Sequence, residues 1–390
     1  MARANRYHMT IMKIGFDAKR AVFNMTGLGN YSRTLIRTLA VQYPQDVFKL
    51  YSPGLSENPR LDFLKNTPNA TISVPKGIYA GTLSGIWRSF GVCSDIKRDK
   101  IDVFHGLSNE LPFGIGRIRT SKIVTVHDLI FKRYPQYYPG LDRRIYDIKT
   151  RYACRVADAI VAVSEQTKSD IVEFYKTDPK KIVVIYQNCD QSFSQSVGEN
   201  EKSAVRSRYN FPSQFVLYVG SIEERKNLLG LVKAIAALRK THDLFLVALG
   251  RGTAYQKEVE RFVESSGMSD RIQIRSDVAF SDFPAIYQMA QALVYPSHFE
   301  RFGNPILEAL WSKTPVITSE GGCFNEAGGP ASIYVNSKNS EEIAEALRKV
   351  LGDSNLRAKM ISGGYTHAQK FREETVARQM MDLYKSLQGR

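Results

Sequence analysis

The sequence predicts two α/β domains in tandem, each built around a parallel sheet. The chain has 390 residues, and a domain usually holds roughly 100–200 residues, so one small domain is excluded. Short apolar runs rich in β-branched residues alternate with longer amphipathic stretches, which is typical of alternating strands and helices. This alternation stops at a polar stretch, residues 191–213, and then starts again.

The first domain is expected over residues 12–190, after a basic tail at residues 1–11. Its expected strands are apolar on both faces, as in a parallel sheet covered by helices on both sides. They are IMKIGFD (11–17), KIDVFHG (100–106), KIVTVHD (122–128), DAIVAVS (158–164) and KIVVIYQN (181–188). Residues 191–213 are rich in Ser, Asn and charge and have no strand pattern, so we expect the domain linker there.

The second domain is expected over residues 214–370. Its expected strands are FVLYVGS (215–221), DLFLVALG (243–250), RIQIRS (271–276), ALVYPS (292–297), TPVITS (314–319) and SIYVN (332–336). Its expected helices are 227–240, 254–266, 282–290, one from 305, and two closing helices near 340–351 and 354–388, with a break at Gly363-Gly364. Because α/β domains bind ligands at the carboxyl ends of their strands, two of them should form a cleft.

The composition of the chain excludes several classes of protein. Hydrophobic residues make up 43% and charged residues 24%, as in an ordinary globular protein. No apolar run approaches the roughly 18–20 residues of a membrane-spanning helix. The four cysteines are far apart without a C-x-x-C pair, which indicates a reducing, cytoplasmic setting rather than zinc or redox chemistry.

The net charge of +15 is uneven, because residues 1–200 hold 29 basic and 18 acidic residues. Such an excess can attract phosphorylated ligands, an anionic membrane or nucleic acid, or can simply form a solvated surface. The basic residues are scattered and no nucleic-acid motif is present, so we expect no nucleic-acid partner.

Two motifs stand out in the first domain. Gly27-Leu28-Gly29-Asn30-Tyr31 precedes a helix expected from about Tyr31, and its glycines would let backbone N–H groups approach a ligand. Ser32 stands where a dinucleotide fingerprint needs glycine, which disfavours hydride chemistry; a plain turn is the alternative. Val126-His127-Asp128 ends a strand, where His127 could exchange a proton or serve only as a structural hydrogen-bonding residue.

The first strand of the second domain leads into Gly220 and then Glu223-Glu224-Arg225-Lys226-Asn227. Two cations here would face the positive end of the next helix, with Asn227 as its N-cap, unless an anion lies between. We therefore interpret Arg225 and Lys226 as phosphate ligands, with Arg251 in a further strand-end loop.

The segment PSHFERFGNPILEAL (296–310) carries the richest pattern. Pro305 suits the first position of a helix, so residues 302–304 would offer backbone N–H groups to an anion. Glu300 and Glu308 flank this turn and can accept hydrogen bonds from hydroxyls. A phosphate between hydroxyls describes a sugar nucleotide, although two ordinary surface glutamates remain the alternative.

Several other chemistries lack their motifs. There is no D-x-D pair and no His, Asp or Glu cluster with ligand spacing, so we expect no metal. A G-x-x-x-x-G-K-[S/T] loop and a G-x-S-x-G turn are also missing, which excludes P-loop NTPases and α/β-hydrolases.

The order of these motifs resembles the retaining glycosyltransferases of family 4, also called group 1. The motifs are G-x-G-x-Y, VHD, VSEQTKSDI (163–171), GSIEERKN (220–227), YPSHFERFGNPILEAL (295–310) and TPVITSEGG (314–322). The resemblance extends over nearly the whole chain from Lys13, and Glu300 with Glu308 is its most specific part. It implies the GT-B fold: two Rossmann-like domains facing across a central cleft, with a C-terminal helix (371–390) packing back on the first domain.

By this resemblance the second domain would hold the nucleotide sugar, with Glu308 on the ribose, Arg225 and Lys226 on the diphosphate and Glu300 on the sugar. The first domain would receive the acceptor. The implied catalytic residues are His127, Glu300, Arg225 and Lys226. The implied donor-binding residues are Gly29, Gly220, Arg225, Lys226, Arg251, Glu300, Phe302, Gly303, Asn304 and Glu308. The implied acceptor-side residues are Gly27, Asn30, Tyr31 and Asp128.

The resemblance also implies a reaction. A hexose or deoxyhexose would move from GDP-mannose or a UDP-sugar to a polysaccharide or lipid-linked acceptor, with retention of configuration and without metal or cofactor. We favour attack on the same face as the departing diphosphate, which cations and helix N-termini would stabilise. The protein is expected in the cytoplasm, with peripheral contact to an anionic membrane.

Two departures keep alternatives open. Arg301 and Ser221 stand where many members have Gly and a basic residue, respectively. A sugar-nucleotide epimerase or phosphorylase on the same fold, or a binding module whose catalytic site has decayed, are the alternatives.

Overall fold

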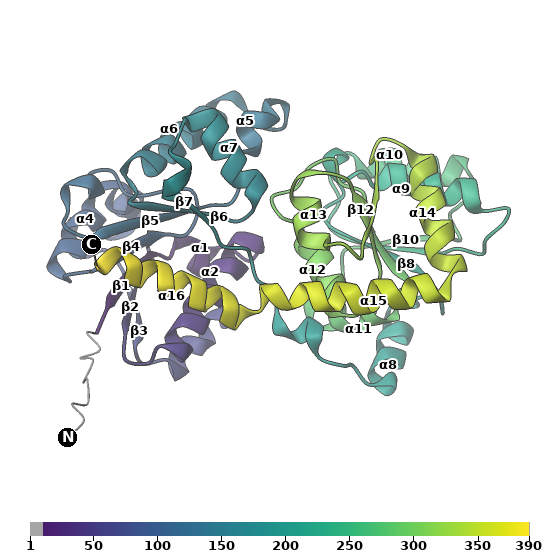
Figure 1. The fold of residues 1–390 in the computed structure, drawn as a ribbon, viewed down its shortest axis with the longest axis horizontal. Coiled ribbons are helices and arrows are strands. Elements are labelled where there is room, and N and C mark those ends of the chain that lie inside the picture. Colours follow the sequence, from purple (N-terminus) through teal and green to yellow (C-terminus); the bar gives the residue numbers. More distant parts are fainter. Residues whose placement is uncertain (1–10, 390) are drawn as a thin grey trace, which may run out of the picture. The chain divides into compact units, whose positions relative to one another are not determined.

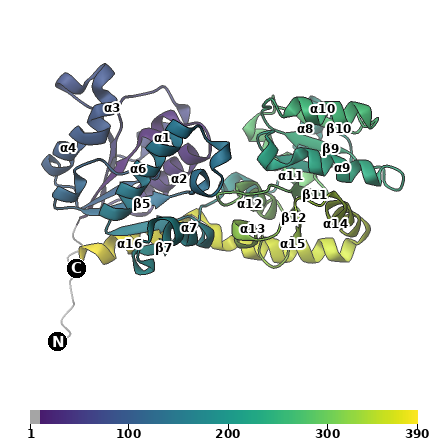
Figure 2. The ribbon, with the colours of Figure 1, turned by 90° about the horizontal axis from the view of Figure 1, so that it is seen from above.

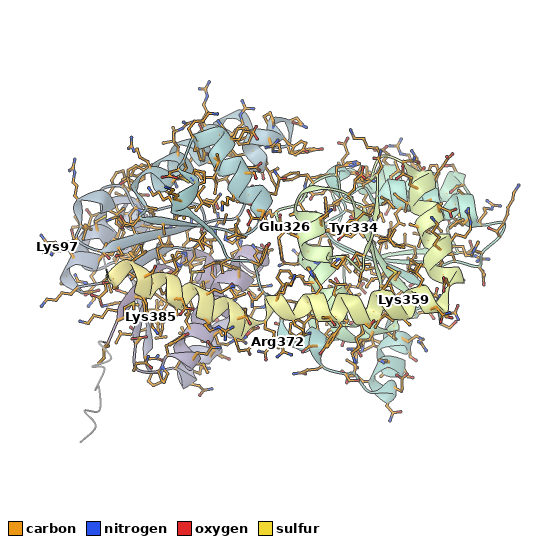
Figure 3. The ribbon with its side chains drawn as sticks, viewed as in Figure 1. Lys97, Glu326, Tyr334, Lys359, Arg372 and Lys385 are labelled. Atoms are coloured by element: carbon orange, nitrogen blue, oxygen red, sulfur yellow. The ribbon has the colours of Figure 1, made fainter. Side chains whose placement is uncertain are left out.

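The computed structural model describes residues 11–389, which form two compact units. The first unit contains the chain up to Asn188 and again from Glu373, and the second contains Cys189–Arg372. Arg372, labelled in Figure 3, is therefore the last residue of the second unit. The chain passes between the units twice.

A seven-stranded sheet forms the centre of the first unit, and all its strand pairs are parallel. In spatial order the strands are β3 (Ala70–Ser73), β2 (Val47–Tyr51), β1 (Lys13–Asp17), β4 (Val103–Gly106), β5 (Ser121–Val126), β6 (Ala159–Ala162) and β7 (Ile182–Val184). Two of them, β2 and β3, were not expected. Lys49 interrupts the apolar run of β2, and β3 is a partly exposed edge strand, so neither has the pattern of a fully buried strand.

Helices cover both faces of this sheet (Figures 1 and 2). One face packs against α2 (Gly27–Gln42) and α16 (Glu373–Gln388). The other packs against α4 (Val92–Arg98), α6 (Gly140–Val156) and α7 (Glu165–Tyr175). The shorter helices are α1 (Lys19–Phe23), α3 (Ser84–Ile86) and α5 (Ile130–Arg133).

The C-terminal helix belongs to the first unit, as the resemblance to family 4 implied. Its residues Val376, Met380 and Tyr384 are buried in the same core as α2 and β1, and α16 lies along α2. The prediction of two parallel Rossmann-like sheets with a returning helix is therefore confirmed.

The second unit is built on a six-stranded parallel sheet. Its spatial order is β10 (Ile272–Arg275), β9 (Leu246–Leu249), β8 (Val216–Val219), β11 (Ala292–Tyr295), β12 (Val316–Ser319) and β13 (Ile333–Val335). Its helices are α8 (Glu199–Tyr209), α9 (Leu228–Leu238), α10 (Gln256–Ser265), α11 (Phe283–Met289), α12 (Asn304–Trp311), α13 (Gly322–Gly328), α14 (Ser340–Gly352) and α15 (Ser354–Ala368).

Two segments differ from their expected form. Residues 191–213, expected as a linker, lie within the second unit, and α8 in this segment buries Val205 and Tyr209 and packs against α11. The expected helix break at Gly363-Gly364 is wrong, because α15 continues through both glycines. A Cβ at Gly364 would lie 2.6 Å from Leu310, so the missing side chain lets α15 approach α12.

Within residues 11–389, no helix has both the length and the apolar character that crossing a membrane requires.

Candidate active site

The predicted donor residues of the second unit, apart from Arg251 after β9, follow two neighbouring central strands, β8 and β11. The sheet is extended from β8 toward β9 and β10 on one side, and from β11 toward β12 and β13 on the other. This is the point where the strand order reverses, and α/β sheets bind ligands at the carboxyl ends of strands at such a point.

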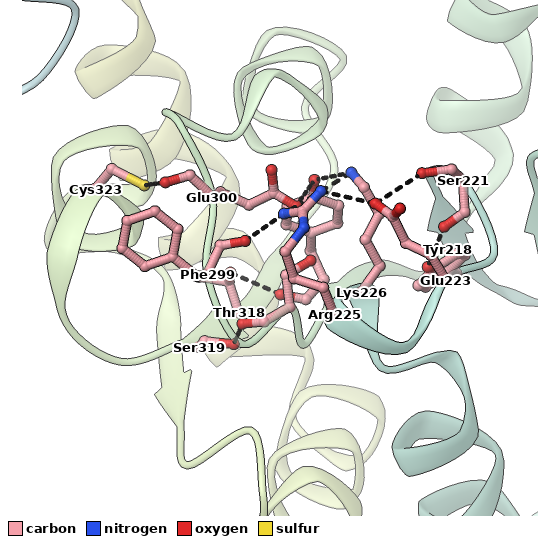
Figure 4. Close-up of polar contacts among 12 residues, drawn as sticks. Tyr218, Ser221, Glu223, Arg225, Lys226, Phe299, Glu300, Thr318, Ser319 and Cys323 are labelled. Atoms are coloured by element: carbon pink, nitrogen blue, oxygen red, sulfur yellow. Dashed lines mark hydrogen bonds and ion pairs between the residues drawn. The ribbon is translucent and has the colours of Figure 1, made fainter. Parts of the chain in front are cut away.

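Glu300 is the centre of a buried charged cluster after β11 (Figure 4). Its residue exposure is 7%. Oε1 of Glu300 lies 3.0 Å from Nη1 of Arg225 and 3.1 Å from Nζ of Lys226. The Tyr295 hydroxyl donates to the same oxygen at 2.8 Å and accepts from Lys226 at 2.8 Å. Within residues 11–389, the hydrogen bonds and ion pairs of the Glu300 carboxylate thus all end on Oε1.

The charge state of Glu300 follows from these neighbours. Burial alone would raise the pKa of its carboxyl group, but the charges of Lys226 and Arg225 lower that pKa to about 2. Arg225 is held further by Glu223, 2.7 Å away, and by the backbone carbonyl of Phe299. Glu300 is therefore a stable anion at neutral pH.

This cluster changes the electrostatic argument made from the sequence. Arg225 and Lys226 lie in a 3-10 turn, Glu224–Lys226, ahead of α9. The Glu300 carboxylate compensates the charge of both cations and Glu223 adds a second anion beside Arg225, so their position does not by itself require a phosphate. The predicted N-cap is confirmed, because the Asn227 side chain accepts from the N–H of Gly230.

Asn227 also fixes this turn against the loop after β11. Its backbone is left-handed, with φ of 55°, and its side-chain amide donates to the carbonyls of Pro296 and Ser337 at 3.2 and 2.6 Å. One side chain therefore holds the Arg225–Lys226 turn in register with the segment that carries Glu300.

The second predicted carboxylate, Glu308, lies in the second turn of α12 and is partly buried. The Tyr287 hydroxyl donates to its Oε2 at 2.6 Å. Burial, with a contribution from Asp190, raises the pKa of Glu308 to about 7. The two glutamates therefore differ sharply in charge behaviour.

The turn between the glutamates begins α12. Gly303 is the N-cap, with φ of 104°, a conformation that a side chain disfavours. Asn304 is the first helical residue and Pro305 the second, one position later than predicted. Phe302 is buried and its ring contacts that of Phe371, with centroids 5.5 Å apart.

The remaining donor candidates lie in the loops after β8 and β9. Gly220 has φ of 152°, and a Cβ there would come within 2.9 Å of the Lys226 side chain. Gly250 crosses the carbonyl of Gly220 so closely that a Cβ would lie 1.8 Å from it. Arg251 follows and is exposed. These glycines therefore set the close approach of the two loops.

His127 lies at the carboxyl end of β5 in the first unit and is buried. Its Nε2 donates to the Leu107 carbonyl at 2.9 Å, and its Nδ1 accepts from the Gln187 side-chain amide at 2.8 Å. These roles assign a neutral imidazole with the proton on Nε2. The Tyr31 ring meets it edge-on, with centroids 4.8 Å apart.

A chain of buried polar groups runs from this region to α16. The Tyr31 hydroxyl lies 3.2 Å from Thr125 Oγ1, which lies 2.8 Å from His105 Nε2. His105 Nδ1 then lies 2.7 Å from the Tyr384 hydroxyl. Burial lowers the pKa of His105 to about 3, so this imidazole is neutral.

The glycine motif of the first unit differs from its expected form. Helix α1 intervenes after β1, and α2 begins at Gly27 rather than near Tyr31. A Cβ at Gly29 would lie 1.7 Å from the Asn24 carbonyl oxygen, and the Asn24 side chain accepts from the N–H of Gly29. Close packing against Asn24 therefore explains the glycine at position 29 without a ligand.

Two acceptor-side candidates near this motif are also engaged. Asn30 Oδ1 accepts from Arg33 and Arg60 at 2.6 and 2.9 Å. Asp128 Oδ1 accepts from the N–H of Ile130 at 3.0 Å. Gly27 is exposed, and a Cβ there would meet nothing within 4 Å.

Comparison with known proteins identifies the family. Residues 25–192 match "Glycosyltransferase Family 4" and residues 199–367 match "Glycosyl transferases group 1". The chain is a family 4 glycosyltransferase. The family 4 enzyme is 26% identical over 390 residues to the "O-antigen chain mannosyltransferase B" of Escherichia coli, covering 96% of this chain and 100% of that relative.

Solved structures show that this glycosyltransferase has the GT-B fold. A glycosyltransferase from Rickettsia africae ESF-5 matches with a TM-score of 0.76 and 17% identity, over 97% of this chain and 99% of that one. Anabaena Alr3699/HepE, in complex with UDP and glucose, matches with a TM-score of 0.73 and 17% identity, over 96% and 100% of the two chains.

Several supporting residues of the second unit were missed in the sequence. Tyr295 bridges Lys226 and Glu300, and Tyr287 holds Glu308. Cys323 donates to the Glu300 carbonyl at 3.2 Å. Tyr295 is the last residue of β11, so its strand-end position was an available signal, whereas nothing in the sequence links Tyr287 or Cys323 to the glutamates. In the described part of the chain, no group of three or more His, Cys, Asp or Glu residues could hold a metal ion.

Proposed function

We propose that this glycosyltransferase moves a hexose, with mannose as the first choice, from a nucleoside diphosphate to a polysaccharide or lipid-linked glycan, with retention and without a metal. The observation that carries the proposal is the Glu300–Arg225–Lys226–Tyr295 cluster at the reversal point of the second sheet. Within this cluster the Glu300 carboxylate is the anion and one of its oxygens is engaged, and Arg225 is also paired with Glu223 beside the cluster.

The donor would bind with its charged and hydroxyl groups divided between the two glutamates. Oε2 of Glu300 has no recorded contact with residues 11–389, and Figure 4 shows it directed away from both cations. This oxygen can accept a hydrogen bond from a hydroxyl group of the sugar. Oε2 of the other carboxylate, Glu308, accepts a hydrogen bond from the Tyr287 hydroxyl. Its Oε1 would accept one from a ribose hydroxyl.

The diphosphate would lie near the N-terminus of α12 and the Arg225–Lys226 turn. Gly303 at the N-cap leaves its neighbouring backbone N–H groups without a covering side chain, and a helix N-terminus favours an anion. Exposed Arg251 adds a further cation. These groups would stabilise the charge that develops on the departing nucleoside diphosphate.

The state of Glu300 supports the same-face route. A carboxylate whose pKa is about 2, with one oxygen bound to two cations, is a weak nucleophile. In the route we propose, the bond between C1 and the diphosphate oxygen breaks, the acceptor oxygen bonds to C1 on the same face, and the acceptor proton passes to the departing phosphate.

Donor and acceptor follow from the relatives. The relative that spans the whole chain is named for mannosyl transfer in O-antigen chains, which favours GDP-mannose; the UDP in the Anabaena complex keeps UDP-sugars as the second choice. An acceptor of this kind would place the protein in the cytoplasm, at the inner face of the membrane.

The first test is a thermal-shift screen against UDP, GDP, dTDP, ADP and CMP without added metal. A ligand specific to the folded state adds roughly 2.7 kcal/mol of apparent stability at a hundred times its dissociation constant. We expect one nucleotide, GDP, to raise Tm, and Glu308→Gln and Lys226→Ala to abolish the rise. The control is Glu264→Gln, an exposed glutamate on α10.

The screen is followed by transfer from the selected nucleotide sugar to a glycan acceptor, with the anomeric configuration of the product read by NMR. Donor consumption without acceptor would indicate an epimerase, and nucleotide binding without any turnover would indicate a decayed binding module. An absent shift with every nucleotide, with and without Mg²⁺, would contradict the proposed donor site.

A further inference from the structure

The first unit exposes two stripes of large apolar side chains that the proposed donor site does not use. Leu83, Ile86 and Phe90 lie close to one side of the helical segment before α4 and are 40%, 52% and 56% exposed. The second stripe is on α6, where spacings of four and three residues place Leu141, Ile145 and Ile148 on one face.

The two stripes adjoin each other. The Phe90 ring stacks on Phe113, with centroids 5.3 Å apart, and Phe113 contacts Tyr152 of α6 at 4.7 Å. Arg88 and Lys149, one from each segment, both bind Glu110, at 2.8 and 3.2 Å. We call the six residues of the two stripes the apolar surface; they are Leu83, Ile86, Phe90, Leu141, Ile145 and Ile148.

The segment that carries the first stripe is firmly anchored. Trp87 is buried, and its indole N–H donates to Asp95 at 2.6 Å. Arg88 pairs with Asp17, the last residue of β1, at 2.6 Å. The stripe is thus held at the carboxyl edge of the sheet, the edge where His127 also lies, and its exposure is a fixed feature of the fold.

Basic residues outnumber acidic ones beside the apolar surface, where Asp142 of α6 is an exposed acidic residue. The sequence has no acidic residue between Asp62 and Asp95. On α6, Arg144 and Arg151 are exposed and Arg143 is partly exposed, whereas Asp147 is engaged by Lys132 and Arg151 at 3.2 and 3.5 Å. Apolar side chains with a basic rim match an interface of anionic lipid headgroups over acyl chains.

We propose that the apolar surface binds an anionic lipid bilayer, with its six side chains entering the boundary between headgroups and acyl chains and the arginines of α6 pairing with lipid phosphates. The biological role of this binding rests on the proposed lipid-linked acceptor. The binding itself requires neither the nucleotide sugar nor the acceptor. It assigns a specific face of the first unit to the membrane.

The test is flotation of the full chain with vesicles of phosphatidylcholine, with and without phosphatidylglycerol, at low and high salt. We expect binding only to the vesicles that contain phosphatidylglycerol, weakened by salt. Ile145→Ser/Ile148→Ser and Arg143→Gln/Arg144→Gln should each weaken this binding about tenfold or more.

Matched controls lie elsewhere on the first unit. Val41→Ser/Leu55→Ser removes two apolar side chains that are 63% and 69% exposed, and Lys176→Gln/Lys180→Gln removes two exposed charges. Both pairs should leave the affinity within about twofold. Unchanged Tm in every variant would show that the fold is intact, as expected for exposed positions.

Three results would overturn the proposal. The first is no flotation with anionic vesicles at low salt, and the second is equal binding by the α6 variants and the controls. The third is an oligomer, seen by size exclusion, that Ile145→Ser/Ile148→Ser dissociates, which would make the occupant a second copy. Transfer to a water-soluble acceptor, measured in parallel, tests the proposed function separately.

Discussion

Glu300 in the second unit and His127 in the first were both predicted as reacting groups, but the fold treats them differently. One carboxylate oxygen of Glu300 binds Arg225, Lys226 and Tyr295, and the other binds none of the three. His127, in contrast, has hydrogen-bond partners on both ring nitrogens. The comparison teaches that the second unit presents charge ready for a ligand, while the first unit uses its polar groups to hold its own strand ends.

The largest effect is expected from Glu300→Gln. Removing the charge takes away the anion that Lys226 and Arg225 share and leaves Arg225 paired with Glu223 alone, at a cost of about 3 kcal/mol, and removes an electrostatic element of the site. We expect kcat to fall at least about 100-fold, measured as transfer from the nucleotide sugar selected above, with unfolding followed in parallel.

Glu264→Gln provides the matched carboxylate-to-amide change at an exposed position and should leave both quantities unchanged. Full activity in Glu300→Gln would show that the cluster after β11 is a structural ion pair, and the contrast with the first unit would be lost.

Glu308 gives the second unit a pH dependence of its own. The pKa of Glu308 is about 7 in the folded protein and about 4.3 when unfolded, so the folded state holds an extra proton between these values. Stability should therefore fall as pH rises from about 4.5 to 7, by up to about 3 kcal/mol, and nucleotide affinity should rise over the same range as the carboxylate forms.

Glu308→Gln should flatten both curves, measured by thermal unfolding and by nucleotide titration at successive pH values. A stability curve that stays the same in Glu308→Gln would mean that other groups cause the dependence.

His127→Ala tests the first unit. It leaves the Leu107 carbonyl and the Gln187 amide without their partner, which should lower stability by about 2–4 kcal/mol. If His127 acts by position, as its two hydrogen bonds indicate, kcat should fall less than in Glu300→Gln, and the shape of the pH–rate profile should persist. Loss of one limb of that profile in His127→Ala would instead assign it a proton-transfer role.

Tyr384→Phe should have the smallest effect. It removes one hydrogen bond from neutral His105, at a cost of about 1 kcal/mol. Because the pKa of His105 is about 3 in the folded protein, the folded imidazole stays neutral from about pH 7 to about pH 4 and keeps this hydrogen bond over that range. Denaturant unfolding of Tyr384→Phe, with Tyr365→Phe as control, should therefore show the same penalty at about pH 7 and about pH 5.

Charge and turn chemistry made the second site readable from sequence. Arg225, Lys226, Glu300 and Asn227 carry strong, local signals, and the strand-end rule placed them at one edge of the sheet. The pairing could not be predicted from sequence. That Glu300 neutralises the two cations depends on the contact between β8 and β11, whose paired residues Val216 and Ala292 are 76 positions apart.

The first unit was harder for a related reason. The apolar runs of five strands were recognisable in the sequence, namely β1, β4, β5, β6 and β7. The strand β2, which contains Lys49, and the edge strand β3 were not recognisable. The hydrogen-bond partners of His127 and Gly29 are neutral amides and carbonyls, whose sequence signals are weak because such groups occur throughout the chain. Hydrogen-bonded neutral networks are defined by tertiary contacts, which a single sequence does not reveal.

The return of α16 to the first unit sets an order of assembly. Val376, Met380, Met381, Tyr384 and Leu387 fill the core between α2 and the first sheet, so that core stays open until α16 has left the ribosome. The second unit, Cys189–Arg372, is complete in sequence earlier. During synthesis the unit begun first is therefore finished after the second, and a chain that stops before α16 would carry a folded second unit beside an unfinished first one.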